Sequence, residues 1–135
     1  MPSFDYKEQD SGIFGKISRP LIKVDVYSFT KDKWYGISDI LADTGADISI
    51  LPRNLGESLV KDITKGKIQE VKGIVPFSKL TVYIHNLKFR INSKEFELPV
   101  AIADSDDVLP ILGRVRGIDL FDVTFNKGIK VDIEE

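Results

Sequence analysis

Asp43 is a carboxylate placed between two apolar segments of the chain. Ile40 to Ala42 precede it and Ile48 to Leu51 follow it, and both segments have the Ile and Leu content of buried strands. A partly desolvated carboxylate is costly unless neighbouring groups compensate it. Gly45 lets the chain turn sharply so that backbone N–H groups can face the carboxylate, and the Thr44 hydroxyl can donate or accept. The pattern predicts a carboxylate held rigidly at a turn, which suits general acid–base chemistry.

A second motif, Ile111-Leu112-Gly113-Arg114, lies downstream of the first. Asp43-Thr44-Gly45-Ala46-Asp47 between apolar segments, followed by this motif, resembles the active-site signature of the aspartic proteases, most of all the single-lobed retroviral type, the retropepsins. The resemblance extends over residues 20–133. It implies a mostly-β, closed or folded β-barrel-like fold with one or two short helices. It also implies an aspartic endopeptidase that is active as a homodimer, with Asp43 as the catalytic residue.

The resemblance implies a role for each residue that supports the catalytic aspartate. Thr44 of each copy would hydrogen-bond across the dimer axis, and Gly45 would let the backbone approach the substrate. Asp47 would pair with Arg114 in a bidentate bridge that ties the active-site segment to a helix. Ala46 stands where the two-lobed pepsins usually carry a hydroxyl residue, so the carboxylate has one donor fewer. Because such donors favour the charged form, we expect an activity optimum nearer about pH 5 than about pH 2.

Hydrolysis of a peptide bond by carboxylates alone requires two of them. The charged one takes a proton from water, and the neutral one donates a proton to the scissile group. Two carboxylates a few ångströms apart cannot both be charged, so they share one proton. The chain offers one credible turn of this kind and is too short for two lobes. We therefore expect a homodimer in which Asp43 of each copy meets the other at a two-fold axis.

A hairpin with Gly73-Ile74-Val75-Pro76 at its tip occupies the place of the retropepsin flap, which closes over substrate. A single glycine and a stiffening proline make this tip unlike the retroviral one. An extended polypeptide bound as an added strand would pair with the flap beside apolar side chains. The candidate flap and substrate-binding residues are Lys72, Gly73, Ile74, Val75, Leu109 and Ile111.

Short strands separated by frequent turns account for most of the remaining sequence. Alternation and short apolar runs predict strands at 21–27, 34–42, 48–51, 68–72, 77–91, 95–102, 109–112, 123–125 and 129–133. Short helices are predicted at 53–61, just after Pro52, and at 114–121. Residues 20–135 form the predicted retropepsin-like domain. Residues 1–19 are an N-terminal arm, an edge strand or a removable leader.

Composition argues against several other kinds of protein. The 135 residues suit one domain, and a net charge of −2 does not favour binding to nucleic acid or to an anionic membrane. No apolar run approaches the roughly 20 residues that a membrane helix needs. The lack of cysteine excludes thiol chemistry, and a single histidine excludes a histidine-rich metal site. We expect no metal, no cofactor and an intracellular, cytoplasmic protein.

Three other interpretations of the Asp43 motif stay open. The motif is also compatible with a structural Asx turn in a β domain. A catalytically weak or inactive dimeric module that binds peptides would keep the same fold, and the glycine-poor flap favours this alternative. A protease domain could also act only within a larger assembly, or after loss of residues 1–19.

Other acidic and ionisable residues have simpler interpretations. Asp10-Ser11-Gly12 has a pattern similar to the active-site triplet, but its neighbours Glu8 and Gln9 are polar, so we predict a turn. His85 lies in an alternating strand and is interpreted as a surface or half-buried residue. Asp104 to Asp107 lack the glycine and terminal glutamate of a calcium loop, so a solvated loop is predicted.

Overall fold

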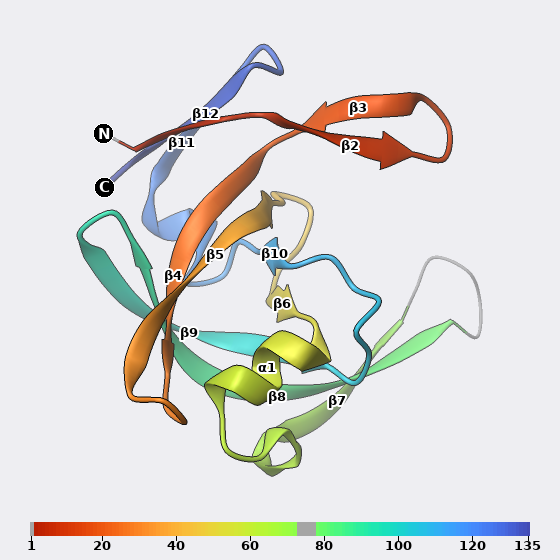
Figure 1. Cartoon of the computed structure of the whole chain (residues 1–135), viewed down its shortest axis with the longest axis vertical. Coiled ribbons are helices and arrows are strands. Elements are labelled where there is room, and N and C mark those ends of the chain that lie inside the picture. Colours follow the sequence, from red (N-terminus) through yellow and green to blue (C-terminus); the bar gives the residue numbers. More distant parts are fainter. Residues whose placement is uncertain (1, 73–77) are drawn as a thin grey trace.

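The computed structural model describes residues 2–72 and 78–135 (Figure 1). Within these ranges the chain is mostly β, as predicted. The strands are β1 (Ser3–Asp5), β2 (Lys7–Ser11), β3 (Gly15–Arg19), β4 (Leu21–Ser28), β5 (Lys33–Ala42), β6 (Ser49–Leu51), β7 (Lys67–Lys72), β8 (Lys79–Ile91), β9 (Lys94–Ala103), β10 (Ile111–Leu112), β11 (Asp122–Asn126) and β12 (Lys130–Glu134). The helical elements are α1 (Arg53–Leu59) and the 3-10 helices η1 (Ile63–Lys65) and η2 (Ile118–Leu120). None of the described helices is long and apolar enough to cross a membrane.

One large sheet closes on itself and forms the body of the molecule. Its strand order is β4-β5-β10-β6-β9-β8-β7, and β4 also pairs with β8. That extra pairing sets Asp25 opposite Arg90 and Val26 opposite Phe89, and it closes six strands into a barrel. Strand β7 continues the sheet beyond β8, outside the closed ring. The predicted β-barrel-like fold is therefore observed.

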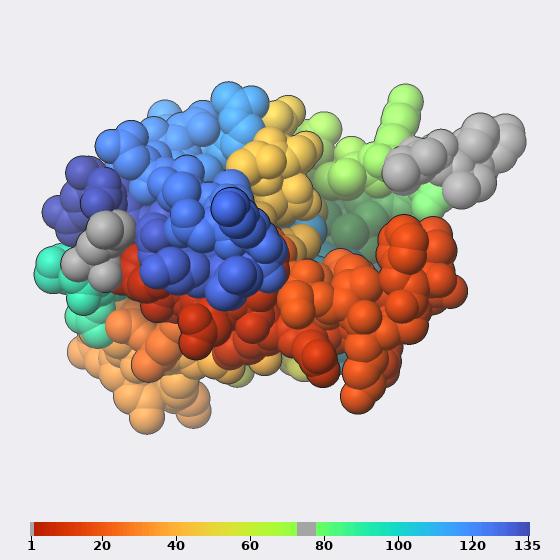
Figure 2. Space-filling model, turned by 90° about the horizontal axis from the view of Figure 1, so that it is seen from above, coloured from red at the N-terminus to blue at the C-terminus, as the bar shows by residue number. Residues whose placement is uncertain are grey.

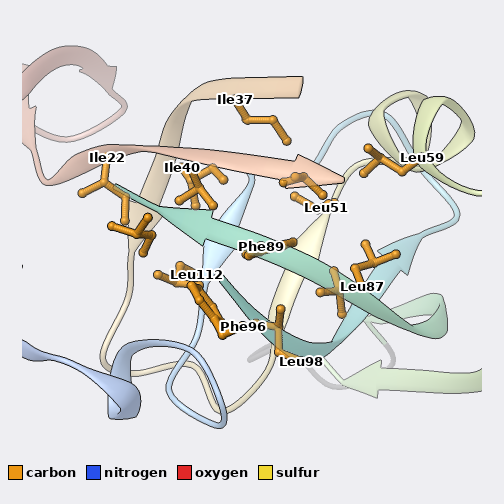
Figure 3. Close-up of a cluster of buried hydrophobic side chains, with 14 of the residues drawn as sticks. Ile22, Ile37, Ile40, Leu51, Leu59, Leu87, Phe89, Phe96, Leu98 and Leu112 are labelled. Carbon is orange, nitrogen blue, oxygen red and sulfur yellow. The ribbon is translucent and has the colours of Figure 1, made fainter. Parts of the chain in front are cut away.

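Aliphatic and aromatic side chains fill the interior of the barrel (Figure 3). Strand β4 buries Ile22, Val24 and Val26 completely at alternate positions, as a strand with one face toward a core must. Phe89 and Phe96 meet edge to face, with ring centroids 6.0 Å apart. Removal of this apolar surface from water is the main stabilisation of the barrel, and the barrel in turn holds its loops in place.

Helix α1 confirms the helix predicted at 53–61, and it packs on β9 through a glycine. A Cβ atom at Gly56 would lie 2.3 Å from Cγ2 of Ile102, a distance that no side chain could occupy. Because residue 56 has no side chain, the helix backbone can approach the sheet directly.

The acidic loop that follows β9 is solvent-exposed, as predicted, and it is also attached to the start of α1. The Asp106 carboxylate accepts a hydrogen bond from the backbone N–H of Asn54 at 2.8 Å. Asp104 forms an ion pair with Arg53. Backbone N–H groups in the first turn of a helix have no partner within the helix, so these acidic groups stabilise its start.

The helix predicted at 114–121 is wrong in its extent. The chain turns from Arg114 to Gly117, and only residues 118–120 form the short 3-10 helix η2. Arg116 has φ of 55°, and Gly117 has φ −118° and ψ −105°. Neither conformation continues a helix, so the helical segment is confined to a single turn.

The first and last strands of the described chain share a small sheet. Strand β12 lies between β1 and β11, so both of its edges are paired. Strands β2 and β3 form a separate two-stranded hairpin, residues 7–19, which we call the arm. The turn predicted at Asp10-Ser11-Gly12 is displaced, because Asp10 and Ser11 end β2 and the turn covers residues 12–14. Oγ of Ser11 accepts hydrogen bonds from the N–H groups of Ile13 and Phe14, both at 3.3 Å.

Asp132 on β12 makes the small sheet sensitive to pH. Hydrogen bonds from the Ser3 side chain and then from Asn126 lower the pKa of Asp132. A folded pKa below the unfolded value means that the contribution of Asp132 to stability is present above about pH 4 and is lost as the pH falls.

We predict that Asp132→Asn makes the free energy of unfolding less dependent on pH than it is in the wild type. Denaturant unfolding at about pH 6 and about pH 3 measures this difference. Asp122→Asn, on the neighbouring strand β11, is the matched control and should keep the wild-type pH dependence. Equal pH dependence in the wild type and Asp132→Asn would contradict the prediction.

Candidate active site

Asp43 lies on the loop that joins β5 to β6, as the sequence predicted. Its Oδ1 accepts a hydrogen bond from the Gly45 N–H at 2.9 Å. Its own N–H donates to the carbonyl of Leu112 at 3.1 Å, and its carbonyl accepts from the Ala46 N–H at 3.3 Å. These hydrogen bonds fix the position of the carboxylate. Because Asp43 is only half-buried, the carboxylate still reaches solvent. A carboxylate in this setting can exchange a proton with a bound water molecule.

Strand β10 brings the two sequence motifs together. Ile111 pairs in parallel with Leu41 of β5 and antiparallel with Ile50 of β6. The strand that enters the Asp43 loop and the strand that leaves it are therefore held apart by β10. The Ile111-Leu112-Gly113-Arg114 motif is thus a structural neighbour of the Asp43 motif.

Gly113 and Ser49 form a buried contact under this loop. The Gly113 N–H donates to Oγ of Ser49 at 2.9 Å, and Ser49 is fully buried. A Cβ atom at Gly113 would lie 2.6 Å from the backbone C and O of Ile48, so the close crossing of the two segments requires glycine. Sequence reasoning missed Ser49. The available signal was a hydroxyl residue within the apolar run from Ile48 to Leu51.

Gly45 lies in the turn after Asp43 and its N–H faces the carboxylate, as predicted. Among the described glycines, only Gly15 and Gly128 have positive φ, so Gly45 does not make its turn with a left-handed backbone. A Cβ atom at Gly45 would lie 3.3 Å from Oδ1 of Asp43, which is a tight contact. The absence of a side chain therefore lets the Gly45 N–H approach the carboxylate. Thr44 is exposed beside it.

The predicted bridge between Arg114 and Asp47 is wrong for the single chain. Nη2 of Arg114 instead lies 3.2 Å from Oδ2 of Asp119, a partner five residues along the same turn, and Asp47 is exposed. The turn that ends at η2 brings Asp119 back beside Arg114, and this local pair replaces the expected one. The backbone makes the connection to the active-site loop, because the N–H groups of Arg114 and Val115 donate to the carbonyls of Ala46 and Asp47, both at 2.9 Å.

The remaining candidate residues are only partly assembled around Asp43. Ile111 is half-buried on β10, next to the strand that ends at Asp43, and Leu109 is half-buried just before it. Lys72 is exposed at the end of β7, where it pairs with Lys79 of β8. Gly73, Ile74 and Val75, the predicted flap tip, lie outside the described residues.

Arg19 is a further residue near the site that sequence reasoning did not single out. It precedes Pro20, whose carbonyl accepts a hydrogen bond from the Ala42 N–H at 3.0 Å, so it lies beside the strand that delivers Asp43. Its Nε is buried and has no hydrogen-bond partner among the described residues. An unpaired buried N–H is unfavourable, so this group is a local cost to the stability of the fold beside the Asp43 strand.

No metal-binding cluster marks the Asp43 face in the described part of the chain. No three His, Asp or Glu side chains come together there as a possible metal site. His85, predicted as a surface or half-buried residue, is half-buried, and its Nε2 lies 2.7 Å from the carbonyl of Ile63. A cavity of about 380 Å³ lies elsewhere, lined by residues that include Pro2, Ile91 and Phe121.

Comparison with known proteins gives a likeness in structure and none in sequence. No family model matches the chain, and no curated protein matches it. Among solved structures, the EIAV protease complexed with the inhibitor HBY-793 is 22% identical with a TM-score of 0.48, over 77% of this chain and 86% of that chain. This likeness concerns only the path of the backbone. It assigns no role to any residue and no activity to this chain.

We predict that Ser49→Ala lowers the free energy of unfolding by about 1–3 kcal/mol, because it leaves the buried Gly113 N–H without an acceptor. Urea denaturation compares this variant with the wild type. Ser93→Ala, in the exposed turn between β8 and β9, is the control and should change stability little. Equal effects from the two substitutions would show that the Ser49 hydrogen bond does not hold the loop.

Proposed function

We propose that this chain is an aspartic endopeptidase that acts as a homodimer, with Asp43 of each copy forming a catalytic pair. The observation that carries the proposal is the geometry of the Asp43 carboxylate. It is half-buried, it accepts the Gly45 N–H at 2.9 Å, and its backbone is attached to the carbonyl of Leu112. A carboxylate that is both fixed and accessible meets the geometric requirement for a general acid or base.

The second copy follows from the chemistry of the pair. One carboxylate must be charged to take a proton from water, while the other must be neutral to donate a proton to the scissile amide. Within the described residues, the other loops place no comparable carboxylate beside Asp43. A two-fold axis through the Asp43 loop supplies the second group from the same position of a second chain.

A further feature of this face supports a dimer. Thr44 is exposed next to Asp43, and its hydroxyl can both donate and accept. A second chain packed on this face would bring polar groups to that hydroxyl.

In the proposed reaction, one carboxylate removes a proton from water and the resulting hydroxide adds to the scissile carbonyl carbon. The other carboxylic acid protonates the carbonyl oxygen, which gives a gem-diol. The first carboxylic acid then gives its proton to the nitrogen as the C–N bond breaks, while the second carboxylate takes a proton back from a diol hydroxyl, so that the pair again holds one proton. An extended polypeptide would lie between Asp43 and the hairpin of β7 and β8, whose tip around Gly73 would close over it. Ile111 and Leu109 would contact its apolar side chains.

We predict that Asp43→Asn lowers proteolysis of an unfolded protein substrate by at least about a hundredfold, because the amide cannot act as base or acid. The assay covers about pH 3 to about pH 7 and several enzyme concentrations. Wild-type activity should rise faster than linearly with concentration, because the dimer is the active species. Asp122→Asn is the control for loss of a carboxylate elsewhere and should keep wild-type activity.

Two results of this experiment would contradict the proposal. Activity that survives Asp43→Asn would place the catalytic group elsewhere. A folded dimer that is inert at every pH would favour a module that binds extended peptides without cutting them, since the same groove would then serve recognition alone.

We predict that Ala46→Ser extends activity to lower pH by about half a unit to one unit. The added hydroxyl can donate to the neighbouring carboxylate, and a hydrogen bond to the charged form favours that form in acid. The pH dependence of kcat/KM measures the acid limb of wild type and variant, with stability checked at each pH. An unchanged acid limb, or a wild-type optimum below about pH 3, would contradict the role given to residue 46.

A further inference from the structure

The arm is a prominent feature that the catalytic proposal leaves without a role. Its tip presents two large apolar side chains, with Ile13 85% exposed and Phe14 74% exposed. Its two strands form a sheet of their own and pair with no other described strand. An isolated two-stranded hairpin is marginally stable in water, and adjacent exposed apolar side chains mark interaction sites. The arm therefore has the properties of a docking element without its partner.

The base of the arm is fixed beside the active-site loop. Nζ of Lys7 lies 2.6 Å from the Asp39 carboxylate and 3.2 Å from the carbonyl of Ser38. At the other strand, the carbonyl of Pro20 accepts the Ala42 N–H at 3.0 Å. These anchors are all on β5, the strand that ends at the catalytic loop. The arm consequently leaves the barrel next to the position proposed for the dimer axis.

The direction of the arm agrees with a role between two copies. In Figure 1 the arm (red and orange, upper right) projects from the barrel toward the same side as the adjoining ends of β7 and β8 (green, right). Figure 2, seen from above, places the arm and these green strands on that same side. The two strands of the arm form five residue pairs. At a rise of about 3.3 Å per residue, the tip of the arm lies about 15 Å from its base, which is far enough to reach a neighbouring chain.

We propose that the arm is a dimer arm, whose Ile13 and Phe14 dock on an apolar surface of a second copy of this chain. The inference rests on the proposed function, because two Asp43 loops that meet at an axis bring the second copy to the base of the arm. Two-fold symmetry makes the contact twice, once from each arm. The apolar surface of four side chains is then removed from water in each dimer.

The chemistry of the arm favours a protein partner of this kind. Its charged residues are of both signs and nearly balanced, namely Lys7, Glu8, Asp10, Lys16 and Arg19. Such a surface does not select an anionic partner. In the small sheet, β12 is paired on both sides, and β1 and β11 form the edges. The arm differs from these edges in carrying two large exposed apolar side chains at its tip and in being anchored to the strand next to the proposed axis.

The test is the double variant Ile13→Ser and Phe14→Ser, with sedimentation equilibrium and enzyme activity measured over a range of concentrations. We expect the dimer dissociation constant to rise by at least about tenfold, since each arm loses two buried apolar side chains. Activity at saturating concentration should equal that of the wild type, and thermal stability of the monomer should not fall, because both side chains are exposed in the single chain.

Phe29→Ser is the matched control. Phe29 is also an exposed aromatic side chain, at 50%, and it follows β4 on the connection to β5, at the end of the barrel away from the arm (Figure 1). This variant should keep the wild-type dissociation constant. A comparable weakening in Phe29→Ser would show that loss of surface apolarity alone weakens association, which would overturn the role of the arm.

The outcomes separate the arm from the catalytic proposal. An unchanged dissociation constant in the double variant overturns the dimer arm, even if Asp43→Asn abolishes activity as predicted. A higher KM with an unchanged dissociation constant also overturns it, since the arm would then contact substrate. A wild-type dimer without proteolytic activity overturns the catalytic proposal, while weaker association of the double variant would still support the arm. A wild-type protein that is active as a monomer overturns both.

Discussion

The position of β10 between β5 and β6 is the constraint on which the candidate site depends. The two strands that flank the Asp43 loop do not pair with each other, since Ile111 lies opposite Leu41 on one side and Ile50 on the other. The loop must therefore span the width of an intervening strand, and its backbone hydrogen-bonds to that strand through the Leu112 carbonyl. This arrangement fixes the carboxylate without using any side chain of the loop itself. The side chains of the loop remain available for substrate or for a second chain.

Backbone contacts, and not ion pairs, hold the two motifs together. The ion pair of Arg114 is local and half-exposed, so it contributes little to stability. The bond from Gly113 to Ser49 is buried, and water cannot replace it if it is lost. A site built in this way resists changes in ionic strength, because hydrogen bonds between neutral buried groups are not screened by salt. The surface charges can then change without moving the Asp43 loop.

Much of the fold could be predicted from the sequence, because strand periodicity and turn residues are local signals. The strands from β4 onward, the helix after Pro52 and the position of Asp43 before a turn follow from such signals, whereas β1, β2 and β3 were not predicted as separate strands. The pairing of β10 could not be predicted, since two residues carry no periodicity and their partners are distant in sequence. The prediction of a helix after Arg114 was wrong because Arg116 adopts a left-handed backbone conformation. That conformation is uncommon for arginine and could not be predicted from the residue type. The structural role of Ser49 could not be predicted, because its hydroxyl acts as an acceptor only once folding brings the Gly113 N–H beside it.

The pairing of β1 with β12 has a consequence for the order in which the chain folds. Strand β1 is synthesised before the other described strands, but its only partner among them lies more than a hundred residues later, at Lys130 to Glu134. During synthesis β1 therefore stays unpaired until all six barrel strands have been made. Contacts between such distant segments form slowly, because a long loop must close before they stabilise anything. Closure of the small terminal sheet is therefore a late folding event, and loss of the β12 segment would leave the first strand without its neighbour.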